Sequence, residues 1–314
     1  MKGYVIADSR YDNMKFRRCG HSGLLLPELA LGFWHNFGAD ADDDKAREII
    51  EYAFDNGITY FDLANNYGPP RGAAETRFGD IVKKSLASHR DEMVIATKAG
   101  HDMWPGPYGE WGSRKSLMAS IDQSLKRLQL DYVDIFYSHR PDPDTPLEET
   151  LQALVDIVRQ GKALYVGISK YPPEMAGKAY EYLKEQKVPC LVYQGRYNML
   201  NRQPDEEIIG QAAASGVGFV AFSPLAQGLL SDRYLSGIPE DSRMTHSQFL
   251  KPEVLTPELL SQLRLWSKEA AEQGLSLSQY ALRWVLRRPE VTSAIVGVSS
   301  VQQLKSNLEA INWI

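Results

Sequence analysis

The decisive stretch of this sequence is Thr59-Tyr60-Phe61-Asp62-Leu63-Ala64-Asn65-Asn66-Tyr67-Gly68. Its first residues are β-branched or aromatic and follow Gly57, so they predict a strand that ends at Asp62. The residues from there to Gly68 are typical of a loop. Asp62 therefore stands at the carboxyl end of a strand, and Tyr67 lies on the loop that follows this strand. In barrels of alternating strands and helices, catalytic residues occupy this position.

Two later strands end in polar residues of the same kind. One apolar run ends in Lys98, and another ends in His139. Three separate strands are thus predicted to bring Asp62, Tyr67, Lys98 and His139 to one rim of the molecule. Each of these residues alone has an ordinary structural explanation, such as a helix cap, a packed ring or an exposed charge. Their shared position at successive strand ends favours a joint chemical role.

The rest of the chain alternates between strands and helices. A glycine-bounded hairpin is predicted at about 15–27, and eight strand–helix units follow it. The strands are apolar on both faces, as parallel strands covered on both sides require. Periodicity alone leaves a doubly wound sheet open, but the number of units favours one (β/α)8 TIM barrel over 1–314, with the hairpin capping its bottom. A long polar loop at about 227–256 interrupts the alternation, and such loops usually serve a function.

Composition excludes several classes of protein. The formal net charge is −5 with no basic run, which disfavours nucleic-acid binding. No stretch approaches the roughly 18 apolar residues of a membrane span, and the first residues lack a signal peptide. The two cysteines, Cys19 and Cys190, lie far apart and are expected to be structural thiols in a reducing compartment. We therefore expect a cytoplasmic protein, and the sequence leaves a homo-oligomer open.

The four rim residues suggest a proton donor. A free tyrosine keeps its proton up to pH ~10, and a neighbouring lysine is expected to lower the pKa of Tyr67. Asp62 can neutralise a buried Lys98, and His139 can orient a carbonyl oxygen beside the phenol. This set can donate a proton to a carbonyl as negative charge develops on it. No side chain supplies a hydride, so a nicotinamide is implied. A barrel hydrolase would need paired carboxylates or metal ligands, and no metal site is expected.

These motifs carry a resemblance to a known family. Over nearly its whole length the chain resembles the aldo-keto reductases, through the segments 57–68, 96–98 and 131–139. The segments 32–38, 67–70, 98–109 and 224–230 resemble more narrowly the bacterial L-glyceraldehyde 3-phosphate reductases, relatives of the potassium-channel β-subunits. The resemblance implies that Tyr67 is the general acid, that Lys98 and His139 tune it, and that Asp62 pairs with Lys98.

The resemblance also implies a site for NADPH or NADP. Ser169 and Gln194 would bind the nicotinamide amide, Phe222 would stack under its ring, and Arg243 would contact the 2′-phosphate. Many family members have asparagine after that serine, where this chain has Lys170. No Gly-x-Gly-x-x-Gly fingerprint follows the first strand, so a Rossmann dehydrogenase is not supported. The further cofactor residues implied are Trp34, Asp62, Ser223, Leu225, Gln227, Gly228, Arg233, Gly297, Ser299, Gln303 and Asn307.

The implied reaction is NADPH-dependent reduction of a small aldehyde, such as L-glyceraldehyde 3-phosphate or a methylglyoxal-like carbonyl. The alternative is an NADP-binding regulatory subunit with little turnover, like the channel β-subunits; these tend to carry asparagine where this chain has His139. Family members usually continue past the last barrel helix with a tail over the active site, which the sequence given does not include. The predicted substrate residues are Trp34, His35, Tyr67, Arg71, Trp104, Trp111, Arg114 and His139, with Lys115 as a further candidate for a phosphate.

Overall fold

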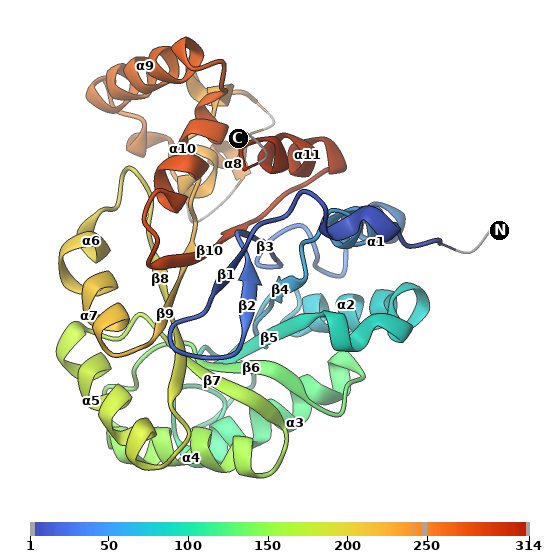
Figure 1. Cartoon of the computed structure of the whole chain (residues 1–314), viewed down its shortest axis with the longest axis vertical. Coiled ribbons are helices and arrows are strands. Elements are labelled where there is room, and N and C mark those ends of the chain that lie inside the picture. The colour runs from blue at the N-terminus through green and yellow to red at the C-terminus, as the bar shows by residue number, and fades with distance from the viewer. Residues whose placement is uncertain (1–3, 241, 247–249, 312–314) are drawn as a thin grey trace.

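A computed structural model describes residues 4–240, 242–246 and 250–311, and the side chains of Glu206, Arg243 and His246 lie outside this description. Eight parallel strands form a closed barrel in the order β10-β3-β4-β5-β6-β7-β8-β9, and helices surround it (Figure 1). The predicted (β/α)8 barrel is therefore confirmed. The barrel strands are β3 (Leu29–Gly32), β4 (Tyr60–Asp62), β5 (Val94–Ala99), β6 (Val133–Ser138), β7 (Ala163–Ser169), β8 (Cys190–Arg196), β9 (Gly218–Phe222) and β10 (Val291–Val296).

The helices lie between consecutive strands. Their starts carry the side chains that helix ends need: Asp42, Ser113, Thr256, Ser276 and Ser300 each accept a hydrogen bond from a backbone N–H of the first turn. The α-helices are α1 (Asp43–Asp55), α2 (Ala73–Ser85), α3 (Arg114–Leu128), α4 (Leu147–Arg159), α5 (Pro173–Glu185), α6 (Gln203–Glu207), α7 (Ile209–Ala214), α8 (Arg243–His246), α9 (Pro257–Glu272), α10 (Leu277–Leu286) and α11 (Val301–Glu309). Short 3₁₀ helices are η1 (Asp8–Tyr11) and η2 (Ala87–Glu92).

The N-terminal hairpin closes the bottom of the barrel, as predicted. Its strands β1 (Phe16–Arg18) and β2 (Leu25–Pro27) pair antiparallel. The backbone N–H of His21 donates to the carbonyl of Gly216, which lies just before β9, at 2.8 Å. Gly20 has a φ of 55°, and a Cβ there would lie 2.2 Å from the same carbonyl oxygen. Only glycine allows the hairpin turn to approach the barrel this closely.

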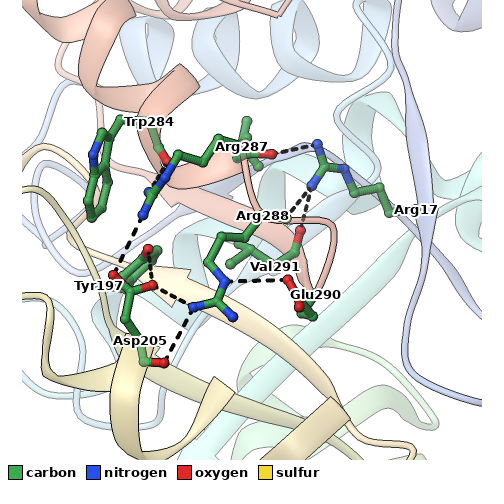
Figure 2. A network of polar contacts seen from close by, with 9 residues as sticks. Arg17, Tyr197, Asp205, Trp284, Arg287, Arg288, Glu290 and Val291 are labelled. Atoms are coloured by element: carbon green, nitrogen blue, oxygen red, sulfur yellow. Dashed lines mark hydrogen bonds and ion pairs between the residues drawn. The ribbon is translucent and has the colours of Figure 1, made fainter. Parts of the chain in front are cut away.

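One arginine ties the hairpin to the turn before β10. Arg17 donates to the carbonyl oxygens of Leu286, Arg288 and Val291 at 2.9, 3.0 and 2.8 Å (Figure 2). The same guanidinium pairs with Glu28 at 2.7 Å. The carbonyls at the end of α10, which lack partners within the helix, are thereby satisfied by a charged donor.

The alternation of strands and helices predicts one helix between β8 and β9, and the structure has two there, α6 and α7. They meet at Ile208, whose φ of −123° and ψ of −35° interrupt the helix and whose side chain is buried. The first of them is fastened to its surroundings through Asp205, which accepts hydrogen bonds from Tyr197 at 2.5 Å and Arg288 at 2.7 Å (Figure 2). These tertiary contacts, which local sequence does not reveal, anchor α6 as a separate element.

The segment predicted as a long polar loop, at about 227–256, is more ordered than expected. Its described part contains α8 and three 3₁₀ turns: η3 (Ala226–Gly228), η4 (Asp232–Tyr234) and η5 (Pro252–Val254). The segment also packs around a small apolar cluster of its own, separate from the barrel core. That cluster contains the buried residues Leu229, Tyr234, Met244 and Leu250.

Both cysteines are buried and free, and burial raises the pKa of each thiol to about 12. They therefore behave as small core residues, as expected. Within the described ranges, every helix is too short or too polar to cross a membrane.

Candidate active site

The strand ends that carry the site are held by hydrogen bonds that continue beyond the strands. The backbone N–H of Leu63 donates to Ala96 at 2.9 Å, and that of Asn65 donates to Lys98 at 3.0 Å. The N–H of His139 donates to Ala99 at 2.9 Å. Because these bonds extend the parallel ladder, the residues just after β4 and β6 are positioned almost as firmly as the strands.

Asp62 and Lys98 form a buried ion pair. The Lys98 Nζ lies 2.6 Å from Asp62 Oδ2 and 2.5 Å from the carbonyl oxygen of Leu63. Both side chains are almost completely inaccessible to solvent. Burial lowers the pKa of Lys98, and the carboxylate of Asp62 opposes this change. The other carboxylate oxygen accepts a hydrogen bond from Gln194 at 2.8 Å and one from Tyr60 at 3.3 Å.

Tyr67 lies between this ion pair and His139. Lys98 Nζ is 5.0 Å from the centroid of the phenol ring, and the His139 ring is 5.9 Å away in an edge-on arrangement. Burial, and secondarily the charge of Asp62, raise the pKa of Tyr67 well above its usual value. The expectation of a lowered pKa is therefore wrong, because Lys98 is already occupied by a carboxylate whose charge also acts on the phenol. The phenol keeps its proton.

Two histidines of the site, His139 and His101, are neutral. Burial and the charge of Lys98 lower the pKa of His139 well below its usual value. His101, which the sequence analysis did not single out, packs edge-on against it with 4.5 Å between ring centroids. Burial, together with Lys170 and Arg140, lowers the pKa of His101 to about 4. At neutral pH each ring therefore has one N–H to donate and one nitrogen to accept.

These residues face a cavity of about 930 Å³ at the carboxyl ends of the strands. Cavities of this size hold a ligand larger than a three-carbon aldehyde. In the described ranges, no group of three or more His, Cys, Asp or Glu side chains is arranged to hold a metal ion. The predicted residues that line the cavity are Trp34, His35, Asp62, Tyr67, His139, Gln194, Phe222, Ser223, Leu225, Gln227, Gly228, Arg233, Gly297, Ser299, Gln303 and Asn307.

Two further predicted residues lie behind the cavity wall. Lys98 and Ser169 are fully buried, and the Ser169 hydroxyl has no hydrogen-bond partner among the described residues. Arg243 begins α8, and its side chain is outside the description. Ser299 and Gln303 are joined by a hydrogen bond of 2.9 Å from the backbone N–H of Ser299, next to the start of α11.

Four predicted substrate residues do not line the cavity. Arg71 is paired with Asp102. Arg114 is paired with Asp156 at 2.5 Å. Trp111 is covered by the guanidinium of Arg140, 3.6 Å from its ring centroid, and Trp104 is likewise absent from the lining. Lys115, the further phosphate candidate, stands over the ring of Tyr108, also away from the cavity. In the described part of the chain, neighbouring side chains as well as loop position thus decide where these groups lie.

Sequence reasoning missed several lining residues. His101, Lys170 and Arg196 face the cavity, as do Asn36 and Asn66. Lys170 directly follows β7 and Arg196 ends β8, so the strand-end argument that selected Lys98 and His139 could have found both.

Comparison with known proteins shows the family of the chain. The model of the Aldo/keto reductase family matches residues 28–313. The L-glyceraldehyde 3-phosphate reductases of Escherichia coli O157:H7 and strain K12 are 54% and 53% identical, over 96% of this chain and 89% of theirs. A probable voltage-gated potassium channel subunit beta of Arabidopsis thaliana is 34% identical, over 96% of this chain and 92% of its own. The chain therefore belongs to the aldo/keto reductase family.

Proposed function

We propose that this protein reduces small aldehydes to alcohols with NADPH, with L-glyceraldehyde 3-phosphate or a methylglyoxal-like carbonyl as substrate. The observation that carries the proposal is a protonated, partly buried phenol, Tyr67, placed between the Asp62–Lys98 ion pair and a neutral His139 in a cavity. The names of the two Escherichia coli relatives support the choice of a phosphorylated substrate.

Each residue has a distinct role in this proposal. Tyr67 donates its proton to the carbonyl oxygen as charge develops there. The ammonium of Lys98, 5.0 Å from the ring centroid, stabilises the phenolate that remains. Asp62 keeps Lys98 charged within a site that disfavours charge. His139, held neutral, donates a hydrogen bond to the same carbonyl oxygen and fixes its direction.

The cavity also fits a nicotinamide cofactor. The buried Ser169 hydroxyl has no partner in the part of the chain that the structure describes, and Gln194 lines the cavity on the neighbouring strand, so both are suited to a carboxamide. The first residues of α11, Val301 and Gln302, offer backbone N–H groups to a phosphate beside the side chains of Ser299 and Gln303, and Arg243 is assigned to the 2′-phosphate. When bound, the cofactor supplies the hydride that no side chain provides.

The test is Tyr67→Phe, which removes only the proton donor. We expect the rate of NADPH oxidation with a good aldehyde to fall by about 10²–10⁴-fold, the usual contribution of a general acid. NADPH binding, followed by fluorescence titration, should be retained. Tyr132→Phe is the matched control, because Tyr132 lies just before β6, at the other end of the barrel. A Tyr67→Phe enzyme with the wild-type rate would contradict the proposal.

The similarity to the Arabidopsis channel subunit favours one other candidate function, an NADP-binding regulatory subunit with little turnover. Measuring NADPH binding and aldehyde turnover of the wild-type protein separates the two candidates. A wild-type protein that binds NADPH tightly but turns over no aldehyde of a broad panel would support the regulatory function.

A further inference from the structure

Two cations at neighbouring strand ends face the cavity. Lys170 directly follows β7, and Arg196 is the last residue of β8. Among the described residues, neither forms an ion pair with a carboxylate. Lys170 Nζ and Arg196 Cζ each lie 5.8 Å from the centroid of the Phe222 ring, so the two charges converge on one part of the wall.

Several other cations near this rim are paired with carboxylates. Lys98 is held by Asp62, and three arginines of the surrounding loops each have a carboxylate of their own. These pairs are Arg71–Asp102, Arg140–Glu110 and Arg114–Asp156. An incoming anion would have to compete with a carboxylate at each of them, whereas at Lys170 and Arg196 it would not.

The backbone holds Lys170 in place. Its φ of 63° lies in the left-handed region, which is uncommon for residues other than glycine. The flanking residues Ser169 and Tyr171 are buried. Tyr171 shares a hydrogen bond of 2.8 Å with the hydroxyl of Ser138, and its carbonyl accepts one of 2.8 Å from Tyr193. The direction in which the Lys170 side chain leaves the backbone is therefore fixed by the core.

Lys170 also stands next to the reaction centre. Its Nζ is 3.5 Å from His101 Nε2, and His101 packs against His139. Burial, and the nearby charges of Lys98, Arg140 and Arg196, lower the pKa of Lys170 to about 8. The ammonium is held among like charges, and an anion bound there would relieve this repulsion.

We propose that Lys170 and Arg196 form an anion subsite that binds the terminal phosphate of the aldehyde substrate. This subsite would bind the substrate in place of Arg71 and Arg114, which the sequence analysis predicted as substrate residues. Lys170 is connected to Tyr67 through His101 and His139, whose rings pack edge-on, so the subsite lies on the His139 side of the phenol. Two cations match the two negative charges of a phosphate monoester better than the single charge of a carboxylate. The inference rests on the proposed reductase function for the identity of the reacting group.

The kinetic test uses Lys170→Met and Arg196→Met, which remove charge and keep side-chain length. The substrates are glyceraldehyde 3-phosphate and glyceraldehyde, which differ only in the phosphate. We expect each change to lower kcat/KM for the phosphorylated aldehyde by about 10- to 100-fold, since a charge-assisted hydrogen bond is lost, and for glyceraldehyde far less. With succinic semialdehyde, a carboxylate, the loss should be smaller. Lys170→Arg should retain the preference for phosphate.

The matched control is Lys187→Met. Lys187 is exposed, has a φ of 59°, and lies just before β8 at the opposite end of the barrel. It therefore reproduces the substitution and the backbone conformation of Lys170 away from the cavity, and it should leave both activities as they are. An equal loss with both aldehydes at Lys170→Met, together with weaker NADPH binding, would show that Lys170 serves the cofactor and would overturn the subsite.

Calorimetry with glycerol 3-phosphate, in the presence of NADP, separates this inference from the reductase proposal, because it needs no turnover. We expect the wild type to bind glycerol 3-phosphate but not glycerol, and Lys170→Met to lose this binding. That result would support the subsite even if no aldehyde were reduced, in which case the reductase proposal alone would fail. Equal binding of glycerol 3-phosphate to the wild type and both methionine variants would overturn the subsite even in an active enzyme.

Discussion

At the residue scale, the site depends on a buried positive charge, the ammonium of Lys98. An isolated ammonium in the interior would lose its proton, and Lys98 is kept charged by Asp62 at 2.6 Å and by the carbonyl of Leu63. The carboxylate in turn is satisfied on its other oxygen by Gln194 and Tyr60. Removing either ion leaves the other buried without a counter-charge, so the pair is expected to act as one unit.

Lys98→Met should therefore lower the free energy of unfolding by about 3–5 kcal/mol, because Asp62 stays buried and unpaired. The double variant Lys98→Met/Asp62→Asn should recover part of that loss, since no charge is then left inside. Urea denaturation of the wild type, both single variants and the double variant completes a double-mutant cycle. Strictly additive losses would contradict the view that the two residues are coupled.

The position of a residue could be predicted from the sequence when the path of the backbone alone determines it. Asp62, Lys98 and His139 stand at the ends of apolar runs, and strand period and topology bring those ends together. Arg71 and Arg114 could not be judged in this way, because their direction is set by Asp102 and Asp156, which are distant in sequence. The pKa of Tyr67 was wrongly predicted for a similar reason: burial outweighs the nearby lysine.

At the element scale, the hairpin β1–β2 is attached to the barrel chiefly at its bottom edge. Arg17 joins it to the turn between α10 and β10 through three carbonyls, and Glu28 neutralises the guanidinium (Figure 2). The hairpin itself was predictable from its glycine-bounded turn. The arginine that fastens it was not, because backbone carbonyls leave no signal in a sequence.

Arg17→Met should lower the free energy of unfolding by about 1.5–3 kcal/mol, the usual contribution of hydrogen bonds to a charged group. The adjacent Arg18 is the control, since it is exposed and donates to Ser22 within the hairpin. Thermal unfolding of Arg17→Met and Arg18→Met compares the two. Equal midpoints for both variants would show that the contacts to α10 and β10 contribute nothing.

At the scale of the whole molecule, stability should depend on pH through His101 and His139. In the folded protein the pKa of His101 is lowered to about 4 and that of His139 is also lowered, whereas both have values near 6.5 when unfolded. Between those values the unfolded chain binds more protons. The free energy of unfolding therefore falls as the pH falls from about 6.5 towards 4.

Each of these histidines adds up to about 1.4 kcal/mol per pH unit to the slope of the free energy of unfolding against pH. His101→Gln removes one of the two groups, so its stability should decline less steeply with acid than that of the wild type. Urea denaturation at pH 7.5, 6 and 5 measures both slopes. Identical slopes for the two proteins would mean that His101 does not resist protonation in the folded state.

Closure of the barrel also sets an order of events during synthesis. Ala294 of β10 pairs with Leu29 of β3, so the ring of strands can be completed only after β10 has left the ribosome. Asp62, Tyr67, Lys98 and His139 emerge long before β10 closes the wall beside them. Until that last strand arrives, the growing polypeptide carries an open sheet with unpaired edges, a state prone to aggregation. We infer that the nascent chain acquires its reactive centre late and in one step.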